Sequence, residues 1–336
     1  MSEREARVPS PVGPLPFSIP AAQAIASAAE QSQGKLGFLV PRSPNPGPSR
    51  FGDTLMRLVF QGIAWMTVAL LVGIFLFLLI NSYRFLSTVP FMDFLFGKSW
   101  NPVSVVELQW GVMPLLAGTV LVSIATLAIG VPFGLGLAVY LSRVASKRTR
   151  EILKPIIEMI AGIPSVVLGL LGLLYLAPFI ADTFHISNGL NALNAAILVG
   201  ITTVPTIASL SEDAITSISE SMVEASLALG ATHWTSIWRV VIPAARSGIA
   251  GAVMLGLGRA IGETMIVLMV AGNSLEFPHS LLDPVRPMTA TIAIEVREVV
   301  VGDLHWSALF AIGLLLFLIT FAINSITDLL LHRSRS

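Results

Sequence analysis

The sequence contains no cysteine and few charged residues. The lack of cysteine excludes disulfide bonds, thiolate metal sites and cysteine nucleophiles. Charged residues make up 12% of the chain, whereas soluble domains carry about 25%. The 20 basic and 20 acidic residues balance, so no net field favours nucleic acid, and five scattered histidines show no zinc-binding spacing. With 54% hydrophobic residues, the composition instead predicts an all-α protein embedded in a membrane.

Long runs without charge predict six membrane-spanning helices. About 20 apolar helical residues cross the hydrocarbon core, where every backbone polar group must bond within the protein. Prolines and glycines in the long charge-free run 108–142 predict a loop followed by a kinked helix. The predicted spans cover about 58–83, 113–142, 159–181, 188–211, 247–272 and 306–327.

The distribution of lysine and arginine predicts the orientation. Cytoplasmic segments of membrane proteins carry the excess of basic residues. Alternate segments, beginning with the one before the first span, hold 15 of the 20 basic residues, and the segments between them hold 4. We therefore expect both termini in the cytoplasm.

The two ends of the chain differ from the span-containing region, residues 51–330. Residues 1–50 carry nine of the 21 prolines and predict a disordered cytoplasmic tail with one short helix around residues 21–29. Residues 331–336 are expected to form a cytoplasmic C-terminal tail.

The predicted cytoplasmic segment 224–243 is too apolar for a simple connector. Residues 225–229 favour helix, Gly230 permits a left-handed exit, residues 234–242 can form a second short helix, and Pro243 is expected to end it. Such a helix–turn–helix at the membrane surface can fill a groove on a partner protein. The alternative is a pair of amphipathic helices that only rests on lipid.

This segment resembles the EAA loop of permease subunits of bacterial ABC importers. The resemblance rests on Glu224-Ala225-Ser226, on Gly230 six positions after Glu224, and on Ile242-Pro243. It implies a type I (MetI-like) permease fold in which the loop forms a coupling helix seated in a separate ATP-binding subunit. Glu224, Ala225 and Gly230 would be the coupling positions. Ser226 replaces the usual alanine, a small change that we expect to be tolerated.

Further stretches are similar to the PstC-type permeases of phosphate-specific ABC importers, over roughly residues 55–330. The most diagnostic is Arg259-Ala-Ile-Gly-Glu263-Thr264, and the others are residues 158–167 and 305–321. The resemblance implies a subunit of the bacterial inner membrane that works with a PstA-like second permease, PstB-like ATP-binding subunits and an extracytoplasmic PstS-like phosphate-binding protein. The binding protein would dock on outward segments 84–112 and 273–305.

ATP chemistry is expected in another chain. The sequence contains no G-x-x-x-x-G-K-[ST] phosphate-binding loop. We therefore expect a non-catalytic subunit that binds no cofactor, with Mg-ATP held by the partner.

Arg259 and Glu263 are the only charged residues placed inside a predicted span. At four residues apart on a continuous helix they would share one face, and we expect them to pair, since each alone costs roughly 2.5–3.5 kcal/mol at the bilayer centre. One interpretation is a structural ion pair. In the other, Arg259 attracts the oxyanion, Glu263 holds its guanidinium, and Thr264 and Ser165 contribute to the substrate path. In the PstC family the matching arginine and glutamate are regarded as important for transport.

Helix breakers beside hydroxyls occur at residues 161–165 and 202–206. They either expose backbone groups to a polar pathway or allow close packing, and packing is favoured. His185 and His305 lie at predicted outer edges, where a solvated side chain is expected.

The residues by themselves are also compatible with two other functions. A permease for another tetrahedral oxyanion, sulfate or molybdate, would have the same general features, because binding-protein contacts usually set selectivity. An ion-coupled secondary transporter also has several spans and buried charge, but it has no use for an ATPase-docking loop.

Overall fold

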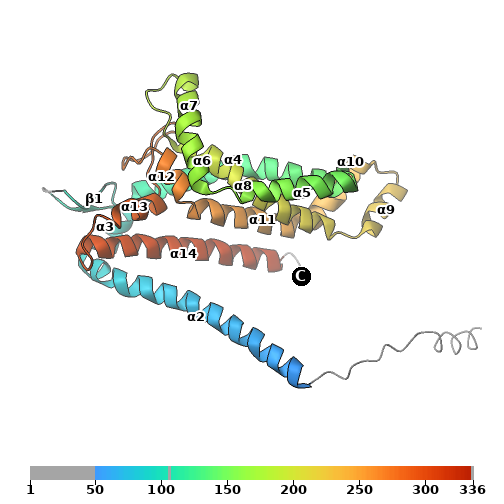
Figure 1. Ribbon diagram of the computed structural model, residues 1–336, viewed down its shortest axis with the longest axis horizontal. Coiled ribbons are helices and arrows are strands. Elements are labelled where there is room, and N and C mark those ends of the chain that lie inside the picture. The colour runs from blue at the N-terminus through green and yellow to red at the C-terminus, as the bar shows by residue number, and fades with distance from the viewer. Residues whose placement is uncertain (1–49, 105–106, 334–336) are drawn as a thin grey trace, which may run out of the picture. The chain divides into compact units, whose positions relative to one another are not determined.

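The computed structural model describes residues 50–104 and 107–333 (Figure 1). The chain divides into two units, Met1–Ala69 and Leu70–Ser336, at a boundary within helix α2 (Arg50–Thr88). In the first unit the described residues belong to α2, and the side chains of residues 54–69 are exposed. The predicted disordered tail lies outside the described residues, apart from Arg50.

The described residues contain six helices long and apolar enough to cross a membrane, as predicted. The helical elements of the second unit are α3 (Phe91–Phe96), α4 (Met113–Val139), α5 (Lys147–Ala161), α6 (Ser165–Leu171), α7 (Ala177–Phe184), α8 (Ala192–Thr216), α9 (Glu220–Ala228), α10 (His233–Ser236), α11 (Ile242–Gly262), α12 (Met265–Val270), α13 (Met288–Glu295) and α14 (Leu304–Arg333). Most of them follow one another with short connections, and longer segments join α3 to α4 and α12 to α13. Three π-helical segments, η1 (Tyr140–Val144), η2 (Gly172–Leu176) and η3 (Ile237–Val241), connect neighbouring helices.

Several helix bounds differ from the predicted spans. The third span begins at Ser165 instead of 159, because Gly162 to Pro164 interrupt the helix and leave α5 as a separate amphipathic helix. The fifth span begins at His233 and ends at Gly262. Helix α14 continues to Arg333, into the predicted C-terminal tail.

The core lies where α4, α8 and α11 pack side by side (Figure 1). Small residues allow this approach: a Cβ placed on Gly134 of α4 or Gly256 of α11 would lie 2.8 Å from Ile207 of α8. The buried hydroxyls of Thr202 and Thr203 both donate to the Val199 carbonyl of their own helix. At residues 202–206 the structure therefore shows packing and not a polar lining.

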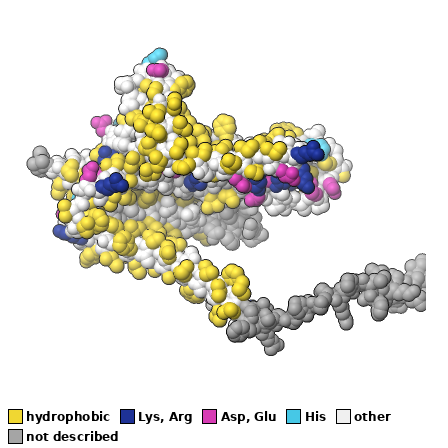
Figure 2. All heavy atoms as spheres, viewed as in Figure 1, with side chains coloured by type: hydrophobic (Ala, Val, Ile, Leu, Met, Phe, Trp, Pro, Cys, Tyr) yellow, Lys and Arg dark blue, Asp and Glu magenta, His cyan; other side chains and the backbone are white. Residues whose placement is uncertain are grey.

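Functional elements gather at the two ends of the second unit. Helices α9 and α10 lie at one end, and α3, α12, α13 and a two-stranded hairpin, β1 (Trp100–Asn101) with β2 (Gln109–Trp110), lie at the other (Figure 1). Charged side chains cluster around α5 and the neighbouring α9–α10 end, while hydrophobic side chains cover α6 and α7 (Figure 2). This distribution suits a bilayer between the two ends.

Candidate functional site

The segment 224–243 folds into the predicted helix, turn and second helix. Gly230 has φ +87°, and an added Cβ would meet nothing within 4 Å, so the backbone conformation, not crowding, calls for glycine. The turn closes with Gly230 N–H donating to the Leu227 carbonyl (2.9 Å) and Ala231 N–H to the Ser226 carbonyl (3.1 Å). Thr232 then caps α10 by accepting from the Thr235 N–H (3.2 Å).

Pro243 does not end the second helix, contrary to the sequence prediction. Helix α10 continues through η3 into α11, and Pro243 lies in the first turn of α11. In a π-helical turn each N–H bonds to the carbonyl five residues back, instead of four as in an α-helix. Where one pattern changes to the other, one position needs no N–H, so proline costs little there. The coupling segment is thus continuous with the fifth span.

The predicted coupling positions are accessible. Glu224, Ala225 and Gly230 are exposed, and Leu229 is 91% exposed. Two further exposed residues, Trp234 and Trp238, stack edge to face at 5.8 Å. A groove of about 600 Å³ lies beside them, lined by Ser142, Arg143, Val144, Glu220, Val223, Glu224, Leu227, His233, Trp234, Ile237 and Val241. An exposed apolar and aromatic surface of this kind suits docking onto a protein.

Arg143, which the sequence analysis missed, holds the start of the loop. One guanidinium nitrogen donates to the Ile215 carbonyl at the end of α8 (2.8 Å), and the other pairs with Glu220 at the start of α9 (3.1 Å). The arginine thus adds a donor to a carbonyl in the last turn of α8 and complements the helix dipole. Its signal in the sequence was a single charge at the end of the second span.

Ser226 does more than occupy the place of the alanine that is usual in the motif. Its hydroxyl hydrogen-bonds the buried Ser236 hydroxyl across the turn (2.6 Å), joining α9 to α10. An alanine at this position has no such bond.

A buried carboxylate anchors α5. Glu212 of α8 is 0% exposed and pairs with Arg150 and with Lys154 Nζ (2.8 Å). The hydrogen bond to Glu212 raises the pKa of Lys154, outweighing the opposing effect of burial. The pairing explains how a charge is buried at the edge of a span.

Arg259 and Glu263 do not form the predicted pair. Helix α11 ends at Gly262, and Glu263 has an extended backbone (ψ 128°). Its Oε1 accepts from the N–H groups of Thr264 (3.1 Å), Met265 (3.1 Å) and Ile266 (3.2 Å), so the carboxylate caps α12. Because glycine weakens a helix and an anion stabilises a helix N-terminus, the chain breaks here and the two residues leave their common face.

Arg259 lies on an open face of α11. Its side chain is exposed and makes no ion pair or hydrogen bond within residues 50–104 and 107–333. Added Cβ atoms on Gly258 and Gly262 would meet nothing within 4 Å, and Leu255 is 56% exposed. An arginine that no carboxylate neutralises is free to bind an anion.

The other two predicted path residues are less exposed. Thr264 is half-buried and its hydroxyl donates to the Gly262 carbonyl (3.2 Å). Ser165 is half-buried at the start of α6, which packs against α12. Within the described residues no hydrogen bond joins Ser165 to Arg259 or Glu263.

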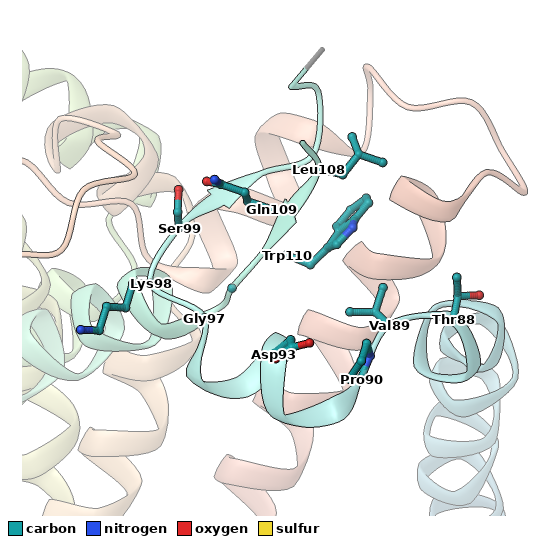
Figure 3. A pocket seen from close by; sticks show the side chains of 11 residues that line it. Thr88, Val89, Pro90, Asp93, Gly97, Lys98, Ser99, Leu108, Gln109 and Trp110 are labelled. Atoms are coloured by element: carbon teal, nitrogen blue, oxygen red, sulfur yellow. The ribbon is translucent and has the colours of Figure 1, made fainter. Parts of the chain in front are cut away.

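A pocket of about 450 Å³ with a mixed polar and apolar lining opens between α3 and the hairpin (Figure 3). Asp93 and Pro90 lie on one side of it and Trp110 and Leu108 on the other, while the Lys98 side chain points away (Figure 3). The pocket lies within segment 84–112, which the sequence predicts to face outward and to contact a binding protein.

Gly97 and Gly111 bring the two sides of this region into contact. A Cβ on Gly97 would lie 2.6 Å from the Gly111 Cα atom, so backbone meets backbone. We expect Gly111→Ala to destabilise the protein by about 1–3 kcal/mol, because neither backbone can yield without moving the hairpin. Thermal unfolding of purified protein measures this. Gly136→Ala on α4 is the control and should not destabilise the protein, since its added Cβ meets nothing within 4 Å and alanine favours a helix more than glycine does.

His305 differs from the sequence prediction, whereas His185 is exposed as expected. The His305 side chain is 12% exposed, and its Nε2 lies 2.8 Å from Oε2 of the buried Glu295. The sequence carried no signal for this contact beyond the two residue types.

The fold defines a multi-pass membrane protein with an exposed helical loop at one end. Residues 130–336 match the family described as "Binding-protein-dependent transport system inner membrane component". The chain belongs to this family.

Individual relatives agree. The phosphate transport system permease protein PstC of Mesorhizobium japonicum is 38% identical over 300 residues, covering 84% of this chain and 90% of the relative. The probable ABC transporter permease protein YqgH of Bacillus subtilis is 34% identical, covering 79% and 86%. A chain of a bacterial alginate ABC transporter, solved in complex with an alginate-bound periplasmic protein, aligns with a TM-score of 0.59 at 15% identity, covering 84% of this chain and 96% of that one. The predicted resemblance to PstC permeases and the all-α permease fold are confirmed.

Proposed function

We propose that this chain is the permease subunit of an ATP-driven phosphate importer and forms half of the translocation pathway. One observation carries the proposal: a relative named as a phosphate transport permease is 38% identical and aligns over 90% of its own length. At that coverage the match extends over most of both chains, not over one shared motif.

Arg259 supports an anionic substrate. It is the basic residue on the open face of α11, and no carboxylate of the described residues neutralises it. A guanidinium offers a planar fork of donors that matches phosphate oxygens. The open glycines beside it leave room for the substrate or for the facing surface of a second permease.

The loop 224–243 supports ATP coupling through a separate chain. Its exposed positions suit a groove on an ATP-binding subunit, and its continuity with α11 gives a direct route from that subunit to Arg259. The proposed assembly contains a PstA-like permease, PstB-like ATPases that hold Mg-ATP, and a PstS-like binding protein outside. This chain itself binds no cofactor and catalyses no reaction.

Reconstitution with these partners tests the function. Phosphate bound to its binding protein is expected to stimulate ATP hydrolysis and phosphate accumulation in liposomes, only when the ATPase subunit is present. Sulfate and molybdate, with their own binding proteins, serve as competing substrates. Stimulation by one of these and not by phosphate would reassign the substrate, and uptake driven by an ion gradient without ATP would indicate a secondary transporter.

We also propose that both termini lie in the cytoplasm. The excess of basic residues in alternate segments supports this orientation. A reporter that is active only in the cytoplasm should be active when it is fused after Asp328. If instead only a reporter that works outside the cytoplasm were active at this position, the proposed orientation would be wrong.

A further inference from the structure

A buried carboxylate joins four separate parts of the outward end. Glu295, the last residue of α13, is 6% exposed. It accepts hydrogen bonds from Trp100 Nε1 (3.1 Å to Oε2), pairs with Arg286 (3.1 Å) and contacts His305 Nε2 (2.8 Å). These partners come from β1, from the loop before α13 and from the start of α14, so one side chain holds all three against α13.

Trp100 carries this contact into the outward hairpin. Its side chain is 1% exposed and packs edge to face on Trp110 of β2 (5.9 Å between ring centroids), and Trp110 packs on Phe85 (5.3 Å). Trp110 also lines the pocket between α3 and the hairpin (Figure 3). The Glu295–Trp100 hydrogen bond therefore ties the hairpin to the end of α13.

The other end of α13 touches the break in the proposed pathway. The Thr289 hydroxyl donates to the backbone carbonyl of Glu263 (2.8 Å), and the Met288 N–H donates to the Thr119 hydroxyl of α4 (3.0 Å). Glu263 in turn caps α12. Residues 289 and 295 are six positions apart, which corresponds to about 9 Å along a helix.

We propose that α13 links the outward hairpin to the Glu263 break, with Glu295 as the positioning residue at the hairpin end and Thr289 at the pathway end. When a binding protein engages the hairpin, movement of Trp100 is passed through this short helix to Glu263. Charge-assisted and buried hydrogen bonds hold both ends of α13. Because of these bonds, α13 cannot stay in place if the hairpin moves. This inference rests on the proposed importer function and names how outside binding reaches the pathway.

The test measures ATP hydrolysis by the reconstituted complex against the concentration of phosphate-loaded binding protein. Trp100→Phe removes one hydrogen bond to a charged group at the hairpin and is expected to raise the half-maximal concentration about tenfold. Thr289→Val removes the bond to Glu263 and is expected to lower maximal stimulation about fivefold while leaving the half-maximal concentration unchanged. Glu295→Gln should change both. Basal hydrolysis should stay at the wild-type level in all three.

Matched controls separate this role from simple stability. Trp306→Phe changes a nearby tryptophan whose recorded contact is a ring contact with Phe310 (5.0 Å), and Glu298→Gln changes an exposed carboxylate three residues after Glu295. Both should behave as wild type. Co-purification of all subunits and thermal unfolding are measured for every variant.

The outcomes are distinguishable. If Thr289→Val and Trp100→Phe kept the wild-type stimulation curve, or if both only lowered the unfolding temperature, the link would be wrong. If the Glu295→Gln variant fails to assemble with its partners, Thr289→Val and Trp100→Phe still test the proposed link. A wild-type complex that no phosphate-loaded binding protein stimulates would instead refute the proposed function itself.

Discussion

Arg259→Gln is expected to abolish phosphate uptake while leaving the complex assembled. The side chain is exposed on α11 and makes no ion pair within the described residues, so its loss leaves no buried partner charge behind. Glutamine keeps a shorter, polar side chain that can still donate a hydrogen bond, but it removes the positive charge that attracts the anion. Uptake of radiolabelled phosphate by cells that lack another phosphate importer measures the effect.

Controls for this variant follow from the same helix. Arg246→Gln, also on α11 and also exposed, should leave uptake unchanged. Arg259→Lys should retain part of the activity, since it keeps the charge but loses the planar fork. Normal uptake by assembled Arg259→Gln would exclude a role in the pathway.

The structure also changes the expectation for Glu263. Because Glu263 caps α12 instead of pairing with Arg259, exchanging the two residues should not restore uptake. Glu263→Gln is expected to impair transport because it weakens the cap of α12, by about 0.5–2 kcal/mol of stability. Rescue by the exchange would show that the two side chains pair in another state of the transporter.

Replacing Gly230 with valine is expected to uncouple ATP hydrolysis from transport. Gly230 has φ +87°, where a residue with a side chain is strained by roughly 1–2 kcal/mol and a β-branched one is disfavoured further. The strain would redirect α10 relative to α9 and move the exposed docking surface. The measurement is the ratio of phosphate transported to ATP hydrolysed in the reconstituted complex.

A graded substitution makes this prediction specific. Asparagine tolerates the left-handed region better than other residues, so Gly230→Asn should be milder than Gly230→Val. Open space around Gly230 means that side-chain volume alone would not harm the variant. Wild-type coupling in Gly230→Val, with all subunits assembled, would remove the coupling role from this bend.

Hydropathy and residue type were enough to predict the spans and the docking loop. A charge-free run long enough to cross a bilayer has few alternatives, because the backbone must satisfy its own hydrogen bonds there. The bend at Gly230 was predictable for a similar local reason, since glycine is the residue that adopts positive φ without strain. The bounds were less accurate, as at Ser165 and His233, where an amphipathic or π-helical segment adjoins the span.

Contacts between distant residues could not be read in this way. Trp100 and Glu295 are 195 positions apart, and Arg143 reaches Ile215 across 72 positions. Neither separation leaves a periodic pattern in the sequence, because these contacts depend on how the helices pack and not on any one helix.

The sequence alone determined that this protein has six helices long and apolar enough to span a membrane, that it presents a bent helical loop resembling the ABC importer coupling motif, and that Arg259 lies in the fifth span. These properties follow from local composition and conformational preference. Only the tertiary structure decided which charges meet: Glu295 and Glu212 find partners on other parts of the chain, whereas Arg259 stays open and Glu263 accepts from the backbone N–H groups that follow it at the start of α12. The reason is that a buried charge is stabilised by whichever donors the folded chain brings to it, and the nearest in sequence need not be the nearest in space.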